Sequence, residues 1–158
     1  PGPGPVGPGP LVGIRKGEHP MNDPGYRVHT VDGYEILVGR SARDNDRLSL
    51  RVARPRDLWL HAHGFAGSHV VVRPALPGDA RDEGDRPATA DVPKPVVERA
   101  AELAAWHSKA RNARGKVAVH LCRGEDVSKP RGAPVGQVRL RRHDTVKVYP
   151  RDWTSGDP

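Results

Sequence analysis

The first strong pattern in the chain is a pair of short runs, rich in apolar residues, on either side of an Asp-Gly pair. The runs lie in YRVHTVDGYEILVGR, residues 26–40, and the pair is Asp32-Gly33. Both residues tolerate the left-handed backbone that a tight two-residue turn requires. The pattern therefore predicts a β-hairpin over 26–40.

A second hairpin is predicted over DLWLHAHGFAGSHVVV, residues 57–72. Successive side chains of a strand point to opposite faces, so the alternation sorts this stretch into two sides. The apolar side is expected to enter the core and consists of Leu58, Leu60, Ala62, Val70 and Val72. The other side gathers Asp57, Trp59, His61, His63, His69 and Arg73.

Two stretches carry helical signals. In VVERAAELAAWHSKARNARG, residues 96–115, the apolar residues recur on one broad face, and Gly115 suits a C-terminal stop. We predict a long Ala-rich helix over about 95–114. The stretch 41–57 is ambiguous, because its leucines and valine alternate like a strand while Asp44-Asn45-Asp46 are typical N-cap residues.

Three further strands are predicted over 116–123, 136–142 and 144–150, the last two joined by a short turn. The predicted fold is α+β, a mainly antiparallel sheet packed by the long helix.

Composition and loop signals define the predicted domain organisation. The opening PGPGPVGPGP cannot pack a core, and 74–93 is rich in Pro, Gly and Asp. We expect a single domain over 25–152, a disordered tail over 1–24, a flexible acidic loop over 74–93 and a short tail over 153–158.

The single cysteine, Cys122, excludes an internal disulfide framework and a zinc site built on several cysteines. The chain contains no apolar run of the length that crosses a membrane. These features predict a cytoplasmic protein, and the excess of Arg over Lys is typical of GC-rich bacterial genomes.

Positive charge is concentrated in the second half of the chain. The formal net charge is +7, and the stretch 109–151 holds 12 Lys and Arg against three carboxylates. Concentrated arginine favours a polyanionic partner such as nucleic acid, because guanidinium groups bind phosphate bidentately. Simple solubility is the alternative explanation.

The polar side of the second hairpin has three possible meanings. His61 and His63, with His69 or Asp57, have the residue types of a metal site. His61 and Asp57 also suit acid–base chemistry of the nuclease type. The interpretation we favour is a network of polar side chains that satisfy one another's hydrogen bonds and shape a binding surface.

The end of the long helix and a later loop supply further candidates. His107, Ser108 and Arg111 continue the helix face that was apolar, so we expect them to meet the polar side of the hairpin, with an Asp57–Arg111 ion pair. Trp106 is either a stacking platform for a base or a side chain covered by a loop. In SKPRGAPVG, residues 128–136, a stiff loop presents Lys129 and Arg131 for phosphate contact.

Four motifs occur in the order found in one known family. They are VGRSARDNDRL (38–48), DLWLHAHGFAGSHVVV (57–72), AAELAAWHSKAR (100–111) and KPRGAPVGQV (129–138). Together they resemble the RNA-binding NFACT-R domain of RqcH- and NEMF-type ribosome quality control proteins. The resemblance favours a short helix over about 45–54, and the chain departs from the family at Ser41 and in the acidic 79–91 segment.

The resemblance implies binding of tRNA or ribosomal RNA, with the large ribosomal subunit as a possible partner, and neither catalysis nor a cofactor in this domain. The predicted RNA-binding residues are Arg40, Asn45, Asp57, Trp59, His61, Gly67, Ser68, His69, Ser108, Lys109, Arg111, Lys129, Arg131 and Gly132. The alternatives are an enzyme or accessory protein of RNA metabolism, such as a metal-dependent nuclease or a tRNA-modification subunit, and a protein–protein adaptor.

Overall fold

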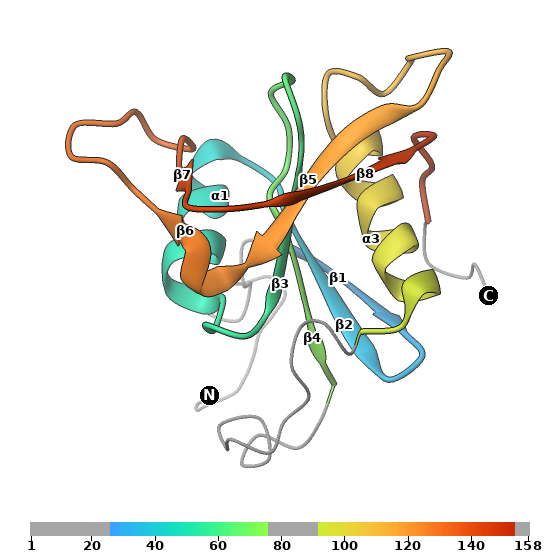
Figure 1. The fold of residues 1–158 in the computed structure, drawn as a ribbon, viewed down its shortest axis with the longest axis horizontal. Coiled ribbons are helices and arrows are strands. Elements are labelled where there is room, and N and C mark those ends of the chain that lie inside the picture. The colour runs from blue at the N-terminus through green and yellow to red at the C-terminus, as the bar shows by residue number, and fades with distance from the viewer. Residues whose placement is uncertain (1–25, 76–91, 154–158) are drawn as a thin grey trace, which may run out of the picture.

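The structure, a computed structural model, describes residues 26–75 and 92–153. Within these ranges the fold is α+β with a six-stranded antiparallel sheet, as predicted (Figure 1). The strand order is β1-β2-β4-β3-β5-β8. The expectations for the two tails and for most of the acidic loop fall outside the described residues.

The first predicted hairpin is confirmed. Strand β1 (Tyr26–Val31) pairs with β2 (Tyr34–Gly39), and Asp32-Gly33 forms the turn between them. Both turn residues have positive φ, 51° and 82°. This is the conformation that makes an Asp-Gly pair suitable for a two-residue hairpin.

The ambiguous stretch after β2 is helical. Helix α1 (Ala42–Arg47) runs directly into a π-helical segment, η2 (Leu48–Val52). The Ser41 hydroxyl accepts a hydrogen bond from the Asp44 amide at 3.1 Å, so the helix begins a few residues before the predicted start. Asn45, predicted near the cap, is instead buried inside the helix.

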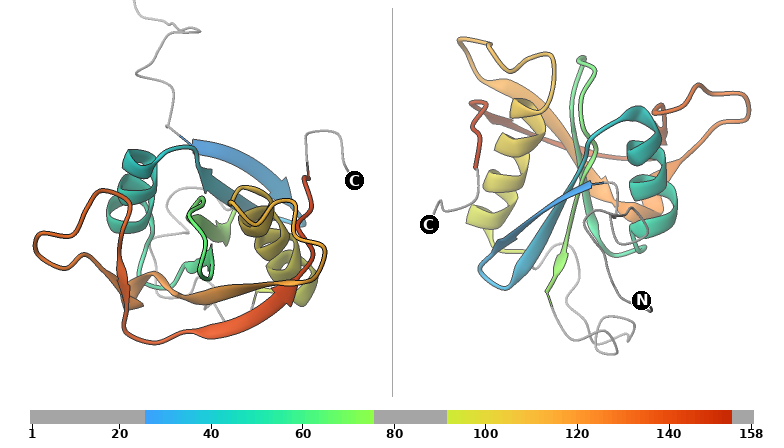
Figure 2. Two further views of the ribbon diagram at one scale, coloured as in Figure 1. Left: turned by 90° about the horizontal axis from the view of Figure 1, so that it is seen from above. Right: turned by 180° about the vertical axis from the view of Figure 1, so that it is seen from behind.

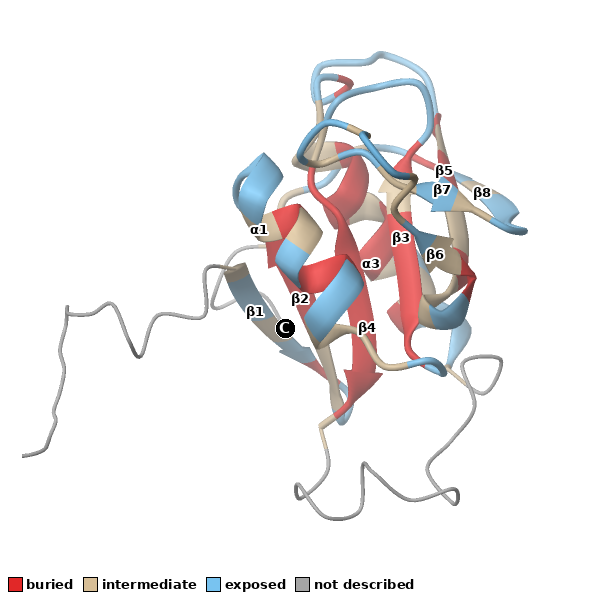
Figure 3. Ribbon diagram, turned by 90° about the vertical axis from the view of Figure 1, so that its left-hand side faces the viewer, coloured by how far each residue is buried: buried red, intermediate tan, exposed pale blue. Residues whose placement is uncertain are grey.

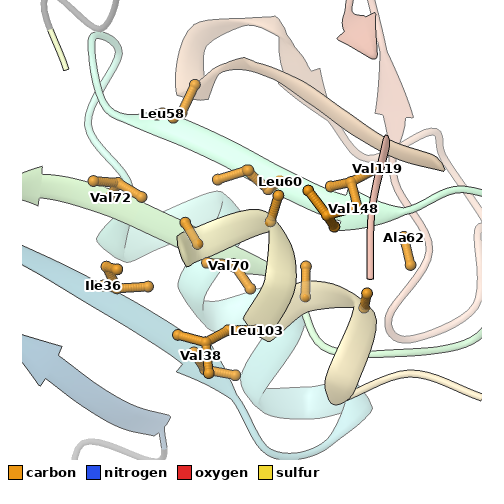
Figure 4. Packing of buried hydrophobic residues seen from close by; sticks show 14 of the residues in the cluster. Ile36, Val38, Leu58, Leu60, Ala62, Val70, Val72, Leu103, Val119 and Val148 are labelled. Carbon is orange, nitrogen blue, oxygen red and sulfur yellow. The ribbon is translucent and has the colours of Figure 1, made fainter. Parts of the chain in front are cut away.

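The second hairpin forms the centre of the sheet. Strand β3 (Leu58–Ala62) pairs with β4 (Val70–Pro74), with Leu58 opposite Val72 and Leu60 opposite Val70. The predicted apolar side enters the main core, as expected from the strand period (Figure 4).

The long helix is shorter than predicted. Helix α3 covers Lys94–Trp106, and residues 107–115 form turns instead of the expected last helical turns. The Ser108 hydroxyl accepts from the Ala110 amide at 3.0 Å, and the backbone of Ser108 forms a β-bridge with Gly67. This tertiary contact draws the chain off the helix axis well before Gly115.

The C-terminal half also differs in part from the prediction. Strand β5 (Val117–Arg123) is followed by a 3₁₀ turn, η4 (Gly124–Asp126), and by the short β6 (Val127–Ser128). The strand predicted over 136–142 is reduced to β7 (Arg139–Leu140), which pairs with β6. Strand β8 (Asp144–Val148) pairs with β5 in the main sheet, so β7 and β8 lie in different sheets. Arg141 binds the buried Asp126 at 2.7 Å, and this ion pair fixes the bend where β7 ends.

The sheet has a helical element on each side (Figure 2). The Ala-rich face of α3 packs on one side and forms the larger core with Val96, Ala100 and Leu103. On the other side, α1 and η2 cover a smaller cluster that includes Leu48 and Trp59. The buried residues accordingly follow β3, β4 and the inner face of α3 (Figure 3).

Candidate nucleic-acid interface

A cleft of about 890 Å³ opens where the segments after β2, β3 and α3 meet. Its walls come from residues 39–45, 64–68 and 107–111, and residues 135–137 close one side. Backbone hydrogen bonds hold the segments together: the Ser68 amide donates to the His107 carbonyl, and the Lys109 amide donates to the Ala66 carbonyl, both at 2.9 Å. The cleft is thus assembled from the four sequence motifs.

Gly67 permits the closest of these contacts. A Cβ atom at this position would lie 2.5 Å from the Ser108 Cβ and 2.7 Å from its Cα, well inside van der Waals distance. The Asn45 side chain supports the same loop by donating to the Gly67 carbonyl at 3.1 Å and accepting from the His69 amide at 3.0 Å. Asn45 therefore positions the wall of the cleft from below.

The cleft is cationic. Four basic side chains line it, from separate segments: Arg27, Arg40, Lys109 and Arg111. No carboxylate is among its lining residues in the described part of the chain. The Arg111 guanidinium lies 4.7 Å from the centre of the Trp106 ring and donates to the Trp106 carbonyl at 3.0 Å, which holds its charge at the rim.

One exposed aromatic ring stands among these cations. Phe65 is 44% exposed, although a side chain of this size is usually buried. An exposed ring next to guanidinium groups suits stacking with a nucleobase while the cations bind phosphates.

A buried polar network lies beneath the cleft. The Trp59 indole donates to the Ser49 hydroxyl at 2.8 Å, and that hydroxyl lies 2.6 Å from Nδ1 of His69. Because Ser49 accepts from Trp59, its own proton is available to His69, which fits a neutral imidazole. Burial, together with the nearby His61, lowers the pKa of His69 to about 3, which agrees with this assignment.

The predicted Asp57–Arg111 ion pair is wrong. Asp57 is buried and binds Arg73 of β4, with 3.0 Å between Oδ2 and Nη2. The β3–β4 register explains the pairing, since Leu58 is opposite Val72 and the next pair along is Asp57 and Arg73. Arg111 lies at the cleft, where it stacks on Trp106.

Lys129 has a role inside the fold. Its ammonium lies 3.1 Å from a carboxylate oxygen of Asp46 and donates to the Pro134 and Gln137 carbonyls at 2.6 and 2.9 Å. These contacts attach the 128–138 loop to α1 and bring 135–137 to the cleft. Arg131 and Gly132 are exposed in the same loop.

The structure thus divides the predicted RNA-binding residues into three groups. The cleft brings together Arg40, Asn45, His61, Gly67, Ser68, Ser108, Lys109 and Arg111. Asp57, Trp59 and His69 are buried below it. Lys129, Arg131 and Gly132 belong to the adjoining loop and are not among the lining residues.

Among the cleft residues that sequence reasoning missed are one cation, Arg27, and one exposed ring, Phe65. Arg27 comes from the edge strand β1, and only the fold shows that it reaches the end of α3. The sequence could have indicated Phe65, because it is the chain's one phenylalanine and lies in a glycine-containing loop, where a large ring is often exposed.

The metal-site interpretation finds no geometric support in residues 26–75 and 92–153. No three His, Cys, Asp or Glu side chains there are arranged to bind one metal ion. Asp57, one of the predicted ligands, forms a buried ion pair with Arg73 instead.

Comparison with known proteins agrees with the motifs. Residues 25–142 match the family described as the NFACT protein RNA binding domain. The chain belongs to this family.

Among curated proteins, the chain is 33% identical to the Rqc2 homolog RqcH of Bacillus subtilis (strain 168), over 86% of this chain and 21% of that protein. It is 37% identical to the Rqc2 homolog RqcH of Streptococcus suis (strain 05ZYH33), over 74% of this chain and 18% of that protein. The chain therefore spans about a fifth of the length of these relatives.

One similar solved structure is the C-terminal part of the fibronectin/fibrinogen-binding protein from Streptococcus suis. It superposes with a TM-score of 0.63 at 34% identity, covering 87% of this chain and 49% of that one. No helix in the described ranges is long and apolar enough to cross a membrane.

Proposed function

We propose that the cleft binds RNA, with tRNA or ribosomal RNA as the ligand, and that the domain acts in ribosome quality control at the large ribosomal subunit, in the cytoplasm. The observation that carries the proposal is the cleft itself, which holds four cations, an exposed Phe65 and no carboxylate among its lining residues. The names of the relatives support the setting, and the family's description supports the ligand class.

In this proposal the domain binds RNA without acting on it chemically. The imidazole of His61 lines the cleft, and burial, followed by the nearby His120, lowers its pKa. A neutral His61 in the same cleft as Phe65 suits contact with a base, and no carboxylate lines the cleft to work with it as an acid–base pair.

The test measures binding of tRNA and of ribosomal RNA fragments across a salt series. Arg111→Ala and Lys109→Ala should each weaken binding and reduce the salt slope by about one unit, as expected when one phosphate contact is lost. Arg123→Ala is the matched control, because Arg123 lies at the other end of β5 from the cleft and forms an exposed ion pair with Glu125. If all three variants lose the same RNA affinity, the loss reflects the chain's net charge and not a site in the cleft, which contradicts the proposal. Absence of RNA binding by the unmodified chain would also refute it.

A further inference from the structure

Three imidazole rings are stacked on one another at the side of the sheet that α3 does not cover. His63 follows β3, His120 lies in β5, and His143 precedes β8. The ring centres of His63 and His120 are 4.1 Å apart with planes at 21°, and those of His120 and His143 are 3.8 Å apart at 15°. We call this group the histidine stack.

The histidine stack lies on an open part of the sheet. Helix α3 packs against the opposite face, and α1 with η2 covers the region around Trp59 and Val71. His63 and His143 are exposed, whereas His120 between them is half-buried. The two end rings therefore each present one flat side to the surroundings.

The stack adjoins the cleft. His120 is directly opposite His61 in the β3–β5 register, and His61 lines the cleft. His63 is followed at once by Gly64 and Phe65, which also line it. A chain leaving the cleft past Phe65 would thus reach the stack without crossing another element of the fold.

The chemistry of this face fits an anionic chain with flat groups. The other exposed or half-buried outward positions of β5 and β8 are Ala118, Thr145 and Lys147, so they hold a cation and no carboxylate. Asp144, which follows His143, falls on the opposite side of β8 by the strand alternation. It also has no large apolar side chain there, which a protein partner would need for an anchoring contact. Unpaired bases can stack on the rings, whereas a paired duplex hides the flat sides of its bases.

We propose that the histidine stack extends the RNA path of the cleft and binds an unpaired stretch of RNA, with bases stacking on the outer sides of His63 and His143. This inference rests on the proposed function. It adds that the preferred ligand carries a single-stranded segment long enough to reach from the cleft to β8.

Protonation adjusts the same surface. Burial, followed by His143 and His63, lowers the pKa of His120, so the middle ring is neutral at neutral pH. The titratable and charged groups on this side of the sheet besides the stack are the half-buried His61, the buried Cys122 and the exposed Lys147. Asp57, His69 and Arg73 lie on the same side but are buried under α1 and η2, and the exposed Asp144 directly follows His143. Binding of a polyanion favours protonated His120, so affinity should rise as pH falls below neutral.

The test compares a single-stranded uridine-rich 12-mer with a 4-mer and with a blunt duplex, using the full chain. His63→Ala and His143→Ala should weaken binding of the 12-mer by about 5-fold or more, which is the scale of losing one stacked base. Binding of the 4-mer and of the duplex should change by less than about 2-fold. Thr145→Ala is the control on the same face.

His143→Phe separates stacking from charge, because it keeps a flat ring and removes the proton site. It should retain 12-mer binding. A circular dichroism melt identifies any variant that fails to fold. Because His143 is exposed, its variants are expected to fold and to keep the binding test informative even if a His63 variant does not fold. Suppose that Arg111→Ala weakens 12-mer binding while all folded stack variants bind like the unmodified chain. The inference is then overturned and the proposed function stands, and a protein partner is the better occupant of the stack. If the unmodified chain binds none of the RNAs, the proposed function fails first.

Discussion

The buried ion pair between Asp57 and Arg73 leads to the sharpest stability prediction. The Asp57 side chain is fully buried and that of Arg73 is 9% exposed, with 3.0 Å between Oδ2 and Nη2. The same carboxylate oxygen accepts from the Arg54 amide at 2.9 Å, and the same Nη2 donates to the Val52 carbonyl at 2.6 Å. Asp57→Ala therefore leaves a nearly buried guanidinium without its counter-charge.

The expected cost follows from that burial. Removing one partner of a buried pair costs about 3–5 kcal/mol, because the remaining charge stays desolvated. An exposed pair such as Arg123–Glu125, with both side chains 43% exposed, is worth about 1 kcal/mol at most. We expect Asp57→Ala to lower the free energy of unfolding by about 3–5 kcal/mol, a large share of the total stability of a typical domain.

Urea unfolding of Asp57→Ala, Arg73→Met and the double variant tests this. The double variant should lose less than the two single losses combined, by at least about 1 kcal/mol, since neither charge is then left alone. Arg111→Ala should cost less than about 1 kcal/mol, because that side chain lies at the surface. Losses for Asp57 and Arg73 that add within about 0.5 kcal/mol would refute the reasoning, as would a large stability loss in Arg111→Ala.

Three further outcomes are expected. The pKa of His69, lowered to about 3 from the ordinary histidine value of 6.5, means that the unfolded chain binds more protons between these values and that stability falls as pH falls. Urea unfolding should show a loss of about 1 kcal/mol from about pH 6 to about pH 5, and a smaller loss in His69→Gln. Lys129→Ala should cost about 1–3 kcal/mol in thermal or urea unfolding, since a charged group loses several hydrogen bonds, whereas the exposed Arg131→Ala should stay within about 0.5 kcal/mol. Gly67→Ala should cost about 1–3 kcal/mol and weaken RNA binding, because its Cβ would overlap Ser108; in Gly115→Ala, where nothing lies within 4 Å, both readouts should change little.

The parts of the fold that follow from short-range pattern were predictable. The strand period sorted the Asp57–Val72 segment into a core side and a polar side, and the core side is buried as expected. The Asp32-Gly33 turn fixed the first hairpin in the same way. The end of α3 was not predictable, because a contact with Gly67, far away in the sequence, ends the helix at Trp106.

The partner of Asp57 shows where the sequence held more information than the prediction used. Arg73 was already on the same side of the predicted hairpin, and pairing Leu58 with Val72 in an antiparallel register places Asp57 opposite Arg73. Arg111 seemed the better partner only because the helix was expected to continue past Trp106. The cleft itself required the fold, since Arg27 and Phe65 come from elements with no sequence relation to the helix end.

The side of β3 that carries its polar residues is split along its length. Its first half, with Asp57 and Trp59, is covered by α1 and η2, whereas its second half, with His61 and His63, opens to the cleft and the histidine stack. A strand moves as a unit over such short distances, so the buried contacts at one end fix where the open imidazoles lie at the other. A substitution under α1 that shifts β3 should therefore weaken RNA binding without removing any RNA contact. For this reason we propose that Asp57 and Trp59 support the binding surface, and loss of binding in their variants has to be compared with their loss of stability.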